Sequence, residues 1–327
     1  MAFVIAMVLT PPLIVALRRS GILDVPNERS SHSRPTPRGG GLAPIVGMAV
    51  ALLLVDAGHR STRVALVIAI VLFGFLGFGE DIFGVPVAWR LALQFGAAGL
   101  LVPWLLRDIA GPVPVRAVAV LIAVLFVTAY VNAFNFMDGI NGISVAQVVA
   151  AGSAWYFLGR AEDMEPFATA GAVVGAAALA FAPFNFPKAQ VFLGDVGSYA
   201  FGALLAILAV LGIRSGLPFE AVVAPISIYL ADTGTTLVRR FLRGESWSRP
   251  HRDHTYQQLV CYGWSHATVT LTVAALALSI SALGALSLLD RPGIRAVANL
   301  FIVLMLGGYL ALPRLLRRTQ RMAVQPG

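Results

Sequence analysis

The sequence predicts an all-α, polytopic integral membrane protein with about eleven transmembrane helices in a single domain over residues 1–327. Of the 327 residues, 58% are hydrophobic and only 12% are charged. The mean hydropathy is +0.80. A soluble domain of this length needs more charge to cover its surface. Apolar stretches of roughly 17 to 25 residues, each long enough to cross hydrocarbon, recur along the chain.

The first apolar stretch, residues 2–17, lacks a basic leader region and a small-residue cleavage site, so we expect a retained span rather than a signal peptide. The lone Cys261 excludes an internal disulfide and argues against a cysteine metal site. The other expected helices cover residues 42–58, 64–79, 91–106, 115–131, 143–159, 167–183, 198–213, 217–237, 267–289 and 296–313.

The Lys and Arg residues predict the orientation. With the loop after the first helix in the cytoplasm, 16 of the 24 basic residues fall on the cytoplasmic side. We therefore expect a bacterial inner-membrane protein with a periplasmic N-terminus and a cytoplasmic C-terminus. The net charge of +8 mostly reflects this bias, so it calls for no nucleic-acid partner, and the basic C-terminal stretch is typical of contact with anionic lipid. The unusual polar residues also lie in the cytoplasmic loops, which predicts that function resides on this face.

The stretch NAFNFMDGINGIS, residues 132–144, places three asparagines and one aspartate between two apolar runs. Its Asp-Gly and Asn-Gly pairs are typical of a turn, which is one interpretation. Asn132, Asn135 and Asp138 are also spaced three residues apart, on one face of a helix end. Polar groups at a membrane boundary are costly unless they bind something, so the second interpretation is a ligand site.

Acidic residues recur in two other cytoplasmic loops. In FLGDVGS, residues 192–198, Asp195 is flanked by glycines. Ser198 could cap the next helix, or the carboxylate could meet a phosphate or a metal on a turn with little side-chain bulk. Glu80 and Asp81 end an apolar helix, where the helix dipole disfavours acids. This pair indicates a cation-binding or proton-transfer role, with a solvated helix end as the alternative.

Basic residues occupy the remaining loops. Arg38 and the three glycines after it precede a predicted helix, an arrangement that suits phosphate. The HRDH stretch offers His251 and His254, but no further Cys or His completes a zinc site. Arg252 between the two histidines indicates an anionic ligand instead. Asp232 lies near the inner end of its predicted helix, where an ionisable group is a functional candidate. Together the loops predict a site for a metal and a phosphorylated substrate.

PTPRGGG, EDIFG, NAFNFMDGING, FLGDVGS and HRDH occur here in one order and on one face. In these motifs the chain resembles the polyprenyl-phosphate N-acetylhexosamine-1-phosphate transferases of glycosyltransferase family 4. That family includes the phospho-N-acetylmuramoyl-pentapeptide transferase of peptidoglycan synthesis. The resemblance extends over nearly the whole chain, and FLGDVGS and the NxxNxxDG pattern are its most specific parts.

The resemblance implies transfer of a sugar 1-phosphate from a UDP-N-acetylhexosamine to undecaprenyl phosphate, with release of UMP and with Mg²⁺, or Mn²⁺, as cofactor. Asp195, with Asn135, matches the metal site, and Asp81 matches the position that deprotonates or orients the lipid phosphate. We expect a homodimer. The implied catalytic residues are Asp81, Glu80, Asp138 and Asp195; the implied substrate-binding residues are Asn132, Asn135, Asn141, Arg38, Phe192, His251, Arg252, His254 and Asp232.

Two features depart from the family pattern. The acidic pair begins with Glu80 in place of the usual Asp. The His-Arg-Asp-His form, with RSSHSRPTPRGGG, resembles the O-antigen and lipopolysaccharide branch, which implies a donor of the GlcNAc, FucNAc or QuiNAc type. The peptidoglycan transferase is the alternative within the family. A transporter or flippase of a phosphorylated sugar or lipid is the rival of another class, but it would predict ionisable residues at mid-membrane depth.

Overall fold

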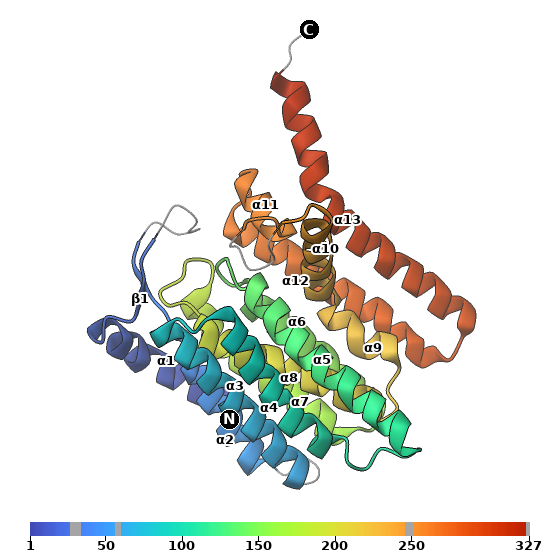
Figure 1. The fold of residues 1–327 in the computed structure, drawn as a ribbon. Coiled ribbons are helices and arrows are strands. Elements are labelled where there is room, and N and C mark those ends of the chain that lie inside the picture. The colour runs from blue at the N-terminus through green and yellow to red at the C-terminus, as the bar shows by residue number, and fades with distance from the viewer. Residues whose placement is uncertain (27–33, 56–59, 246–250, 325–327) are drawn as a thin grey trace.

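The computed structural model describes residues 1–26, 34–55, 60–245 and 251–324, with side chains up to Arg317. Helices make up almost all of it and run side by side as a bundle (Figure 1). In chain order the elements are α1 (Ala2–Arg19), β1 (Leu23–Asp24), β2 (Thr36–Pro37), α2 (Leu42–Leu54), α3 (Arg60–Phe83), α4 (Val87–Leu105), α5 (Val113–Met137), α6 (Ile143–Ala161), α7 (Glu165–Asn185), α8 (Gly194–Arg214), α9 (Phe219–Val223), η1 (Ala224–Ile226), α10 (Ser227–Leu242), α11 (Thr255–Cys261), α12 (His266–Ala285), η2 (Leu286–Leu289) and α13 (Pro292–Val324).

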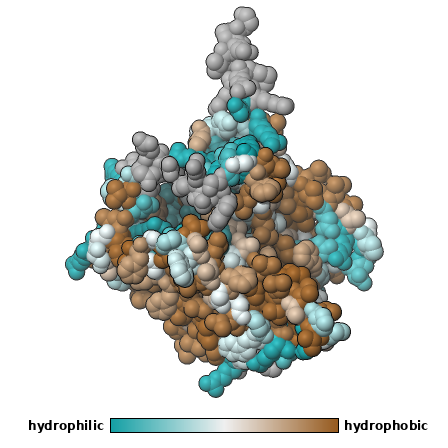
Figure 2. Space-filling view, viewed as in Figure 1, coloured by the Kyte–Doolittle hydropathy of each residue, from teal (hydrophilic) through white to brown (hydrophobic). Residues whose placement is uncertain are grey.

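The predicted fold class is confirmed. Within the described residues, eight helical segments are long and apolar enough to cross a membrane, and each of the eleven predicted segments contains a helix. The count of eleven transmembrane helices stays a prediction, since α2, α4 and α6 are not among these eight segments, and α2 is shorter than a typical span. Figure 2 shows apolar residues over much of the body of the bundle and hydrophilic residues around α10 and α11 at one end.

The centre of the bundle is α8, in which every residue from Gly194 to Ala209 is buried. Helices α3 and α5 pack on it along their length. Helices α6 and α7 form another tight pair, because a Cβ at Gly152 would lie only 2.7 Å from the carbonyl oxygen of Gly171. Glycines at helix crossings let backbones approach closely in membrane proteins, where van der Waals packing replaces the hydrophobic effect as the main attraction.

One expected helix is wrong in detail. Residues 217–237 were expected to form one continuous helix, but this segment divides into α9, the 3₁₀ turn η1 and α10. Pro225 lies inside the turn. Proline lacks the N–H group that a continuous helix needs and its ring clashes with the preceding turn, so the α-helix is interrupted there. As a result α10 starts a new helix that carries Asp232 and ends at Leu242.

Candidate active site

The N-terminus of α8 is capped by Asp81, which comes from α3. The Asp81 carboxylate accepts hydrogen bonds from the backbone N–H of Asp195, at 2.9 Å, and of Val196, at 3.0 Å. These N–H groups lie at the start of α8 and carry the positive end of its dipole. The expectation that Ser198 caps this helix is wrong, because α8 begins at Gly194 and Ser198 lies within it.

Gly77 lets α3 come close enough to α8 for Asp81 to form this cap. A Cβ atom at Gly77 would lie 2.0 Å from the backbone oxygen of Asp195, so only glycine lets α3 pass directly over the start of α8. Asp81 follows about one turn later, at the height of the exposed N–H groups. Gly194, the first residue of α8, has φ +76°, a conformation that favours glycine.

We predict that Gly77→Ala lowers both the melting temperature and the activity, because the added methyl group pushes α3 away from α8 and lengthens the Asp81 hydrogen bonds. Gly79→Ala is the matched control on the same helix, since a Cβ there meets no atom within 4 Å. That control should keep its activity and its melting temperature. Equal behaviour of the two variants would contradict this role of Gly77.

Arg38 joins the carboxylates of α3 and α8. Its Nε lies 2.6 Å from Oδ1 of Asp81, and its Nη2 lies 2.9 Å from Oδ2 of Asp195. The Arg38 side chain is still 35% exposed. The β1–β2 pair and a backbone bridge between Arg38 and Phe192 hold this loop beside FLGDVGS. Two sequence motifs that are far apart in the chain thus share one charged cluster.

The end of α5 adds an amide and a third carboxylate. The side-chain Nδ2 of Asn135 donates to Oδ1 of Asp195, at 2.7 Å, and to the Ser198 hydroxyl, at 3.0 Å. Asp138 forms the C-cap of α5 and is half-buried. Loss of water around its carboxyl, together with the nearby negative charge of Asp195, raises the pKa of Asp138 to about 7.

The side chains of three predicted residues bind partners outside this cluster. Glu80 accepts from the backbone N–H of Val85 and pairs with Arg90 at 2.9 Å. Asn132 donates to Gln94 at 2.6 Å, and Asn141 donates to the carbonyl oxygen of Pro187 at 3.1 Å. These contacts stabilise helix ends and neighbouring loops. Their predicted roles in catalysis or binding remain predictions.

Asp232 organises the segment that carries the histidines. It is fully buried and accepts from the backbone N–H of Thr255, at 2.9 Å, and from the Tyr309 hydroxyl, at 2.8 Å. It therefore caps α11 from α10, much as Asp81 caps α8 from α3. His254 is buried with Nδ1 3.4 Å from Asp232, and its ring lies 5.1 Å from that of His251.

Tyr256 connects this segment to the carboxylate cluster. Its hydroxyl donates to the carbonyl oxygen of Phe136 at 2.9 Å, two residues before Asp138. Burial raises the pKa of Tyr256 above its ordinary range, so the hydroxyl stays a donor. The histidines therefore approach the end of α5. Arg252 is exposed between them.

We predict that Asp232→Asn lowers the melting temperature by several degrees, because an amide nitrogen would replace one oxygen of a buried group that accepts from several donors. Hydrogen bonds to a buried charged group contribute about 1.5–3 kcal/mol each. Asp290→Asn, at an exposed turn where φ is +46°, is the control and should melt like the wild type. A wild-type melting curve for Asp232→Asn would exclude this capping role.

Sequence reasoning missed Gly77 and Tyr256 and misread Ser198. Ser198 lies in the same FLGDVGS motif as Asp195, so the sequence itself indicated that the two residues are close. Gly77 gave no signal, since glycine is common in apolar helices. Tyr256 contacts a carbonyl 120 residues away along the chain. That contact exists only after the helices pack.

The cluster offers few ligands for a metal ion. Among the described residues, no group of three or more His, Cys, Asp or Glu side chains is placed to hold one. Asp81 already binds backbone N–H groups and Arg38. The other donors are the Asp195 carboxylate, which also contacts Asn135 and Arg38, the Asp138 carboxylate and the amide oxygen of Asn135. They are too few for a closed protein cage but fit Mg²⁺, which binds through one or two carboxylates together with substrate phosphates.

A cavity of about 750 Å³ lies beside the cluster. Asn141 and Phe192 line it, so it is continuous with the motifs of the site. Its cationic or titratable lining residues are Arg18, Arg34, Lys188 and His266. A cavity of this size with a basic lining suits an anionic small molecule.

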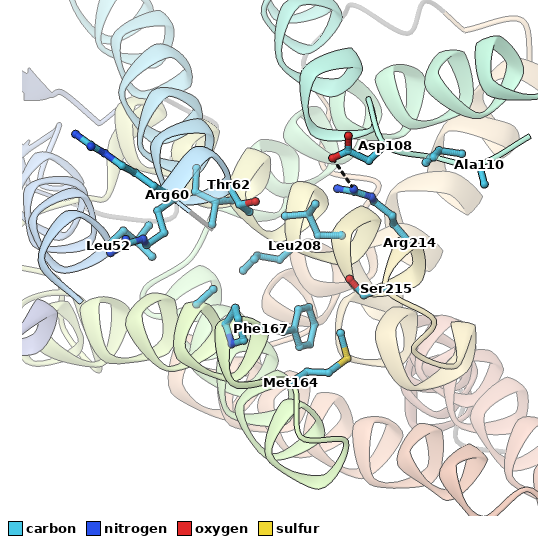
Figure 3. A pocket seen from close by; sticks show the side chains of 16 residues that line it. Leu52, Arg60, Thr62, Asp108, Ala110, Met164, Phe167, Leu208, Arg214 and Ser215 are labelled. Carbon is cyan, nitrogen blue, oxygen red and sulfur yellow. Dashed lines mark hydrogen bonds and ion pairs between the residues drawn. The ribbon is translucent and has the colours of Figure 1, made fainter. Parts of the chain in front are cut away.

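A larger cavity, of about 1130 Å³, is found at the other end of α8 (Figure 3). Arg214, the last residue of α8, lines it and pairs with Asp108 at 3.4 Å. Asp195 is in the first turn of α8, so at 1.5 Å per residue this cavity is roughly 28 Å away. It contains none of the predicted site residues.

The sequence matches the family described as Glycosyl transferase family 4 over residues 63–213. It is 27% identical, over 287 residues, to the probable undecaprenyl-phosphate N-acetylglucosaminyl 1-phosphate transferase of Bacillus subtilis (strain 168), covering 83% of this chain and 80% of the relative. It is 29% identical, over an alignment of 357 residues, to the decaprenyl-phosphate N-acetylglucosaminephosphotransferase of Mycobacterium tuberculosis (strain ATCC 25618 / H37Rv). The alignment covers 97% of this chain and 88% of the relative.

A third relative is the phospho-N-acetylmuramoyl-pentapeptide-transferase of Clostridium beijerinckii (strain ATCC 51743 / NCIMB 8052). The identity is 25% over 319 residues, which cover 88% of this chain and 94% of the relative. The matched region of the family model contains Asp81, Asp138 and Asp195, the three carboxylates of the cluster. The part of the chain that carries these carboxylates is therefore similar to glycosyl transferase family 4.

Proposed function

We propose that this enzyme transfers an N-acetylhexosamine 1-phosphate from a UDP-sugar to a polyprenyl phosphate, giving a polyprenyl-diphospho-sugar and UMP. The observation that carries the proposal is the Asp81–Arg38–Asp195 cluster beside a cation-lined cavity at one end of the membrane helices. At this end a lipid phosphate can arrive from the bilayer and a nucleotide from water. The relatives named above support the same class of reaction.

In the proposed reaction an oxygen of the lipid phosphate forms a bond to the β-phosphorus of the UDP-sugar. The bond from that phosphorus to the bridging oxygen breaks, and UMP leaves with the bridging oxygen. Phosphoryl transfer needs positioning and charge neutralisation more than covalent chemistry. Asp81 and Asn135 hold the Asp195 segment and side chain in place, and Arg38 supplies a partly exposed cation beside it.

We propose Mg²⁺ as the cofactor, held by Asp195 and Asn135 together with the diphosphate. When bound, the ion neutralises the charge that builds up on the leaving phosphate. The remaining lining residues bind and orient the substrates: Asn141 and Phe192 face the basic cavity, and the His251–His254 segment lies near the end of α5. The expected contact of Arg252 with diphosphate or sugar is part of this proposal.

The test is to incubate membranes or purified protein with Mg²⁺, undecaprenyl or decaprenyl phosphate, and a panel of UDP-sugars. UDP-GlcNAc is expected to yield a lipid-linked sugar and one UMP per product. The panel also needs UDP-FucNAc, UDP-QuiNAc and UDP-N-acetylmuramoyl-pentapeptide, because a relative carries the name of the pentapeptide reaction. If no UDP-sugar yields lipid-linked product, the proposal is wrong.

The cellular setting is also a proposal. We propose that the cluster faces the cytoplasm of a bacterium, with the N-terminus in the periplasm, because most of the Lys and Arg residues occupy the loops at this end. Initiation of O-antigen or a related envelope polysaccharide, and assembly as a homodimer, stay predictions. Labelling of cysteines introduced into the loops tests the orientation.

A further inference from the structure

A second basic cavity lies between α10, α11 and α13, at the same end of the bundle as the active site. Its volume is about 250 Å³. The lining is unusual in charge, since five arginines and one acidic residue face it. The acid is Asp253, and the arginines are Arg239, Arg240, Arg243, Arg314 and Arg317.

The arginines of this cavity differ in their partners. Arg240 is 7% exposed and pairs with Asp253 at 2.7 Å and with Glu245 at 2.9 Å. Arg239, Arg314 and Arg317 form no salt bridge within the part of the chain that the structure describes. Arg239 is close enough to Arg314 and Arg243 for their like charges to repel, and Asp232 on the same helix offsets part of this repulsion. Helices α10 and α13 therefore place like charges close together. Their repulsion is unfavourable unless an anion binds between them.

The chemistry of the lining favours a phosphate group. Arginine offers several N–H donors in a planar fork, and this geometry matches phosphate oxygens. The cavity volume is below that of typical sites for drug-sized ligands, so it fits a headgroup better than a whole nucleotide sugar. The cavity shares no lining residue with the basic cavity beside Asp195.

The surroundings indicate that the phosphate belongs to a lipid. Both α10 and α13 lie in segments long and apolar enough to cross a membrane, and the arginines lie at the ends of these segments. Next to them along α10, Val238, Phe241 and Leu242 are 56%, 82% and 77% exposed. Figure 2 shows hydrophilic and apolar residues meeting in this part of the molecule. An anionic head beside exposed apolar side chains matches an amphiphile at the membrane interface.

We propose that the cavity between α10, α11 and α13 binds the phosphate group of an anionic membrane phospholipid. The site is separate from the proposed reaction and does not depend on it. It bears on the histidine segment, because Asp253 pairs with Arg240 and directly precedes His254. A lipid that neutralises the surrounding arginines leaves Arg240 to hold Asp253, which keeps α11 in place against α10.

The experiment measures the melting temperature of the full-length protein in phosphatidylcholine nanodiscs with increasing fractions of phosphatidylglycerol. We expect phosphatidylglycerol to raise the melting temperature of the wild type. In the double variant Arg314→Gln/Arg317→Gln the apparent affinity is expected to be about thirtyfold weaker, since each basic residue near an anionic surface contributes about 1 kcal/mol. The control, Arg116→Gln/Arg291→Gln, removes the same charge from two exposed sites outside this cavity and should respond like the wild type.

Two outcomes would overturn the proposal. The first is an equal response of the double variant and the control, which would show that phosphatidylglycerol acts through general surface charge. The second is the same rise in melting temperature with inorganic phosphate alone in phosphatidylcholine nanodiscs, which would show a site for a soluble anion. Native mass spectrometry gives an independent readout, in which wild type and control retain phosphatidylglycerol and the double variant loses it.

Discussion

Replacing Asp195 by Asn is expected to lower the rate of UMP release from a UDP-sugar by at least about 100-fold, while the protein stays folded. Asp195 lies at the point where α3, α5 and the Arg38 loop meet α8. Its backbone N–H bond to Asp81 does not involve the side chain and survives the substitution. Asn has nearly the same volume, so the packing of α8 is preserved and the change is one of charge.

The measurement is the initial rate of UMP release by purified protein at saturating UDP-sugar, with a melting curve on the same sample. Asp108→Asn is the matched control, because Asp108 is 66% exposed and lines the other cavity, beside Arg214 (Figure 3). It should retain the wild-type rate. Normal turnover by Asp195→Asn would refute its assignment as a metal ligand, and an unfolded variant would refute the argument that only charge changes.

Replacing Asp138 by Asn is expected to abolish activity and yet to stabilise the protein at alkaline pH. The folded-state pKa of Asp138 is about 7, raised from 3.8 mainly by burial. Between these two values the folded state holds a proton that the unfolded state has released. The free energy of unfolding of the wild type therefore falls as pH rises from about 4 to about 7. By pH 8 the carboxyl is ionised in both states, and the full cost of burying its charge lowers the stability of the folded state.

Asn carries no charge at any of these pH values, so the variant escapes that loss. The difference in melting temperature, variant minus wild type, should be near zero at pH 4 and positive by several degrees at pH 8, measured with EDTA present to remove divalent ions. Asp163→Asn, at an exposed turn, is the control and should show no such trend. A difference that stays constant with pH would exclude an elevated pKa for Asp138.

The roles of individual acids show where sequence reasoning stops. Glu80 and Asp81 are neighbours, and both were predicted to be catalytic. Successive residues of a helix point about 100° apart, however, so the two carboxylates reach different partners. Asp81 meets the N–H groups of α8, and Glu80 meets Arg90. Asn132 and Asn135, expected on one helix face, separate in the same way toward Gln94 and Asp195.

The sequence by itself determined that this is an all-α membrane protein, because the lengths and spacing of apolar runs are local properties of the chain. It also showed which loops carry charge, since polar residues are costly within so apolar a protein. Only the tertiary structure decided that Asp81 and Asp232 cap helices from outside, that Arg38 bridges Asp81 and Asp195, and that arginines from α10 and α13 share a cavity. These contacts join residues that are far apart in the sequence. They depend on close helix crossings, such as the one at Gly77, and no local sequence pattern determines where helices cross.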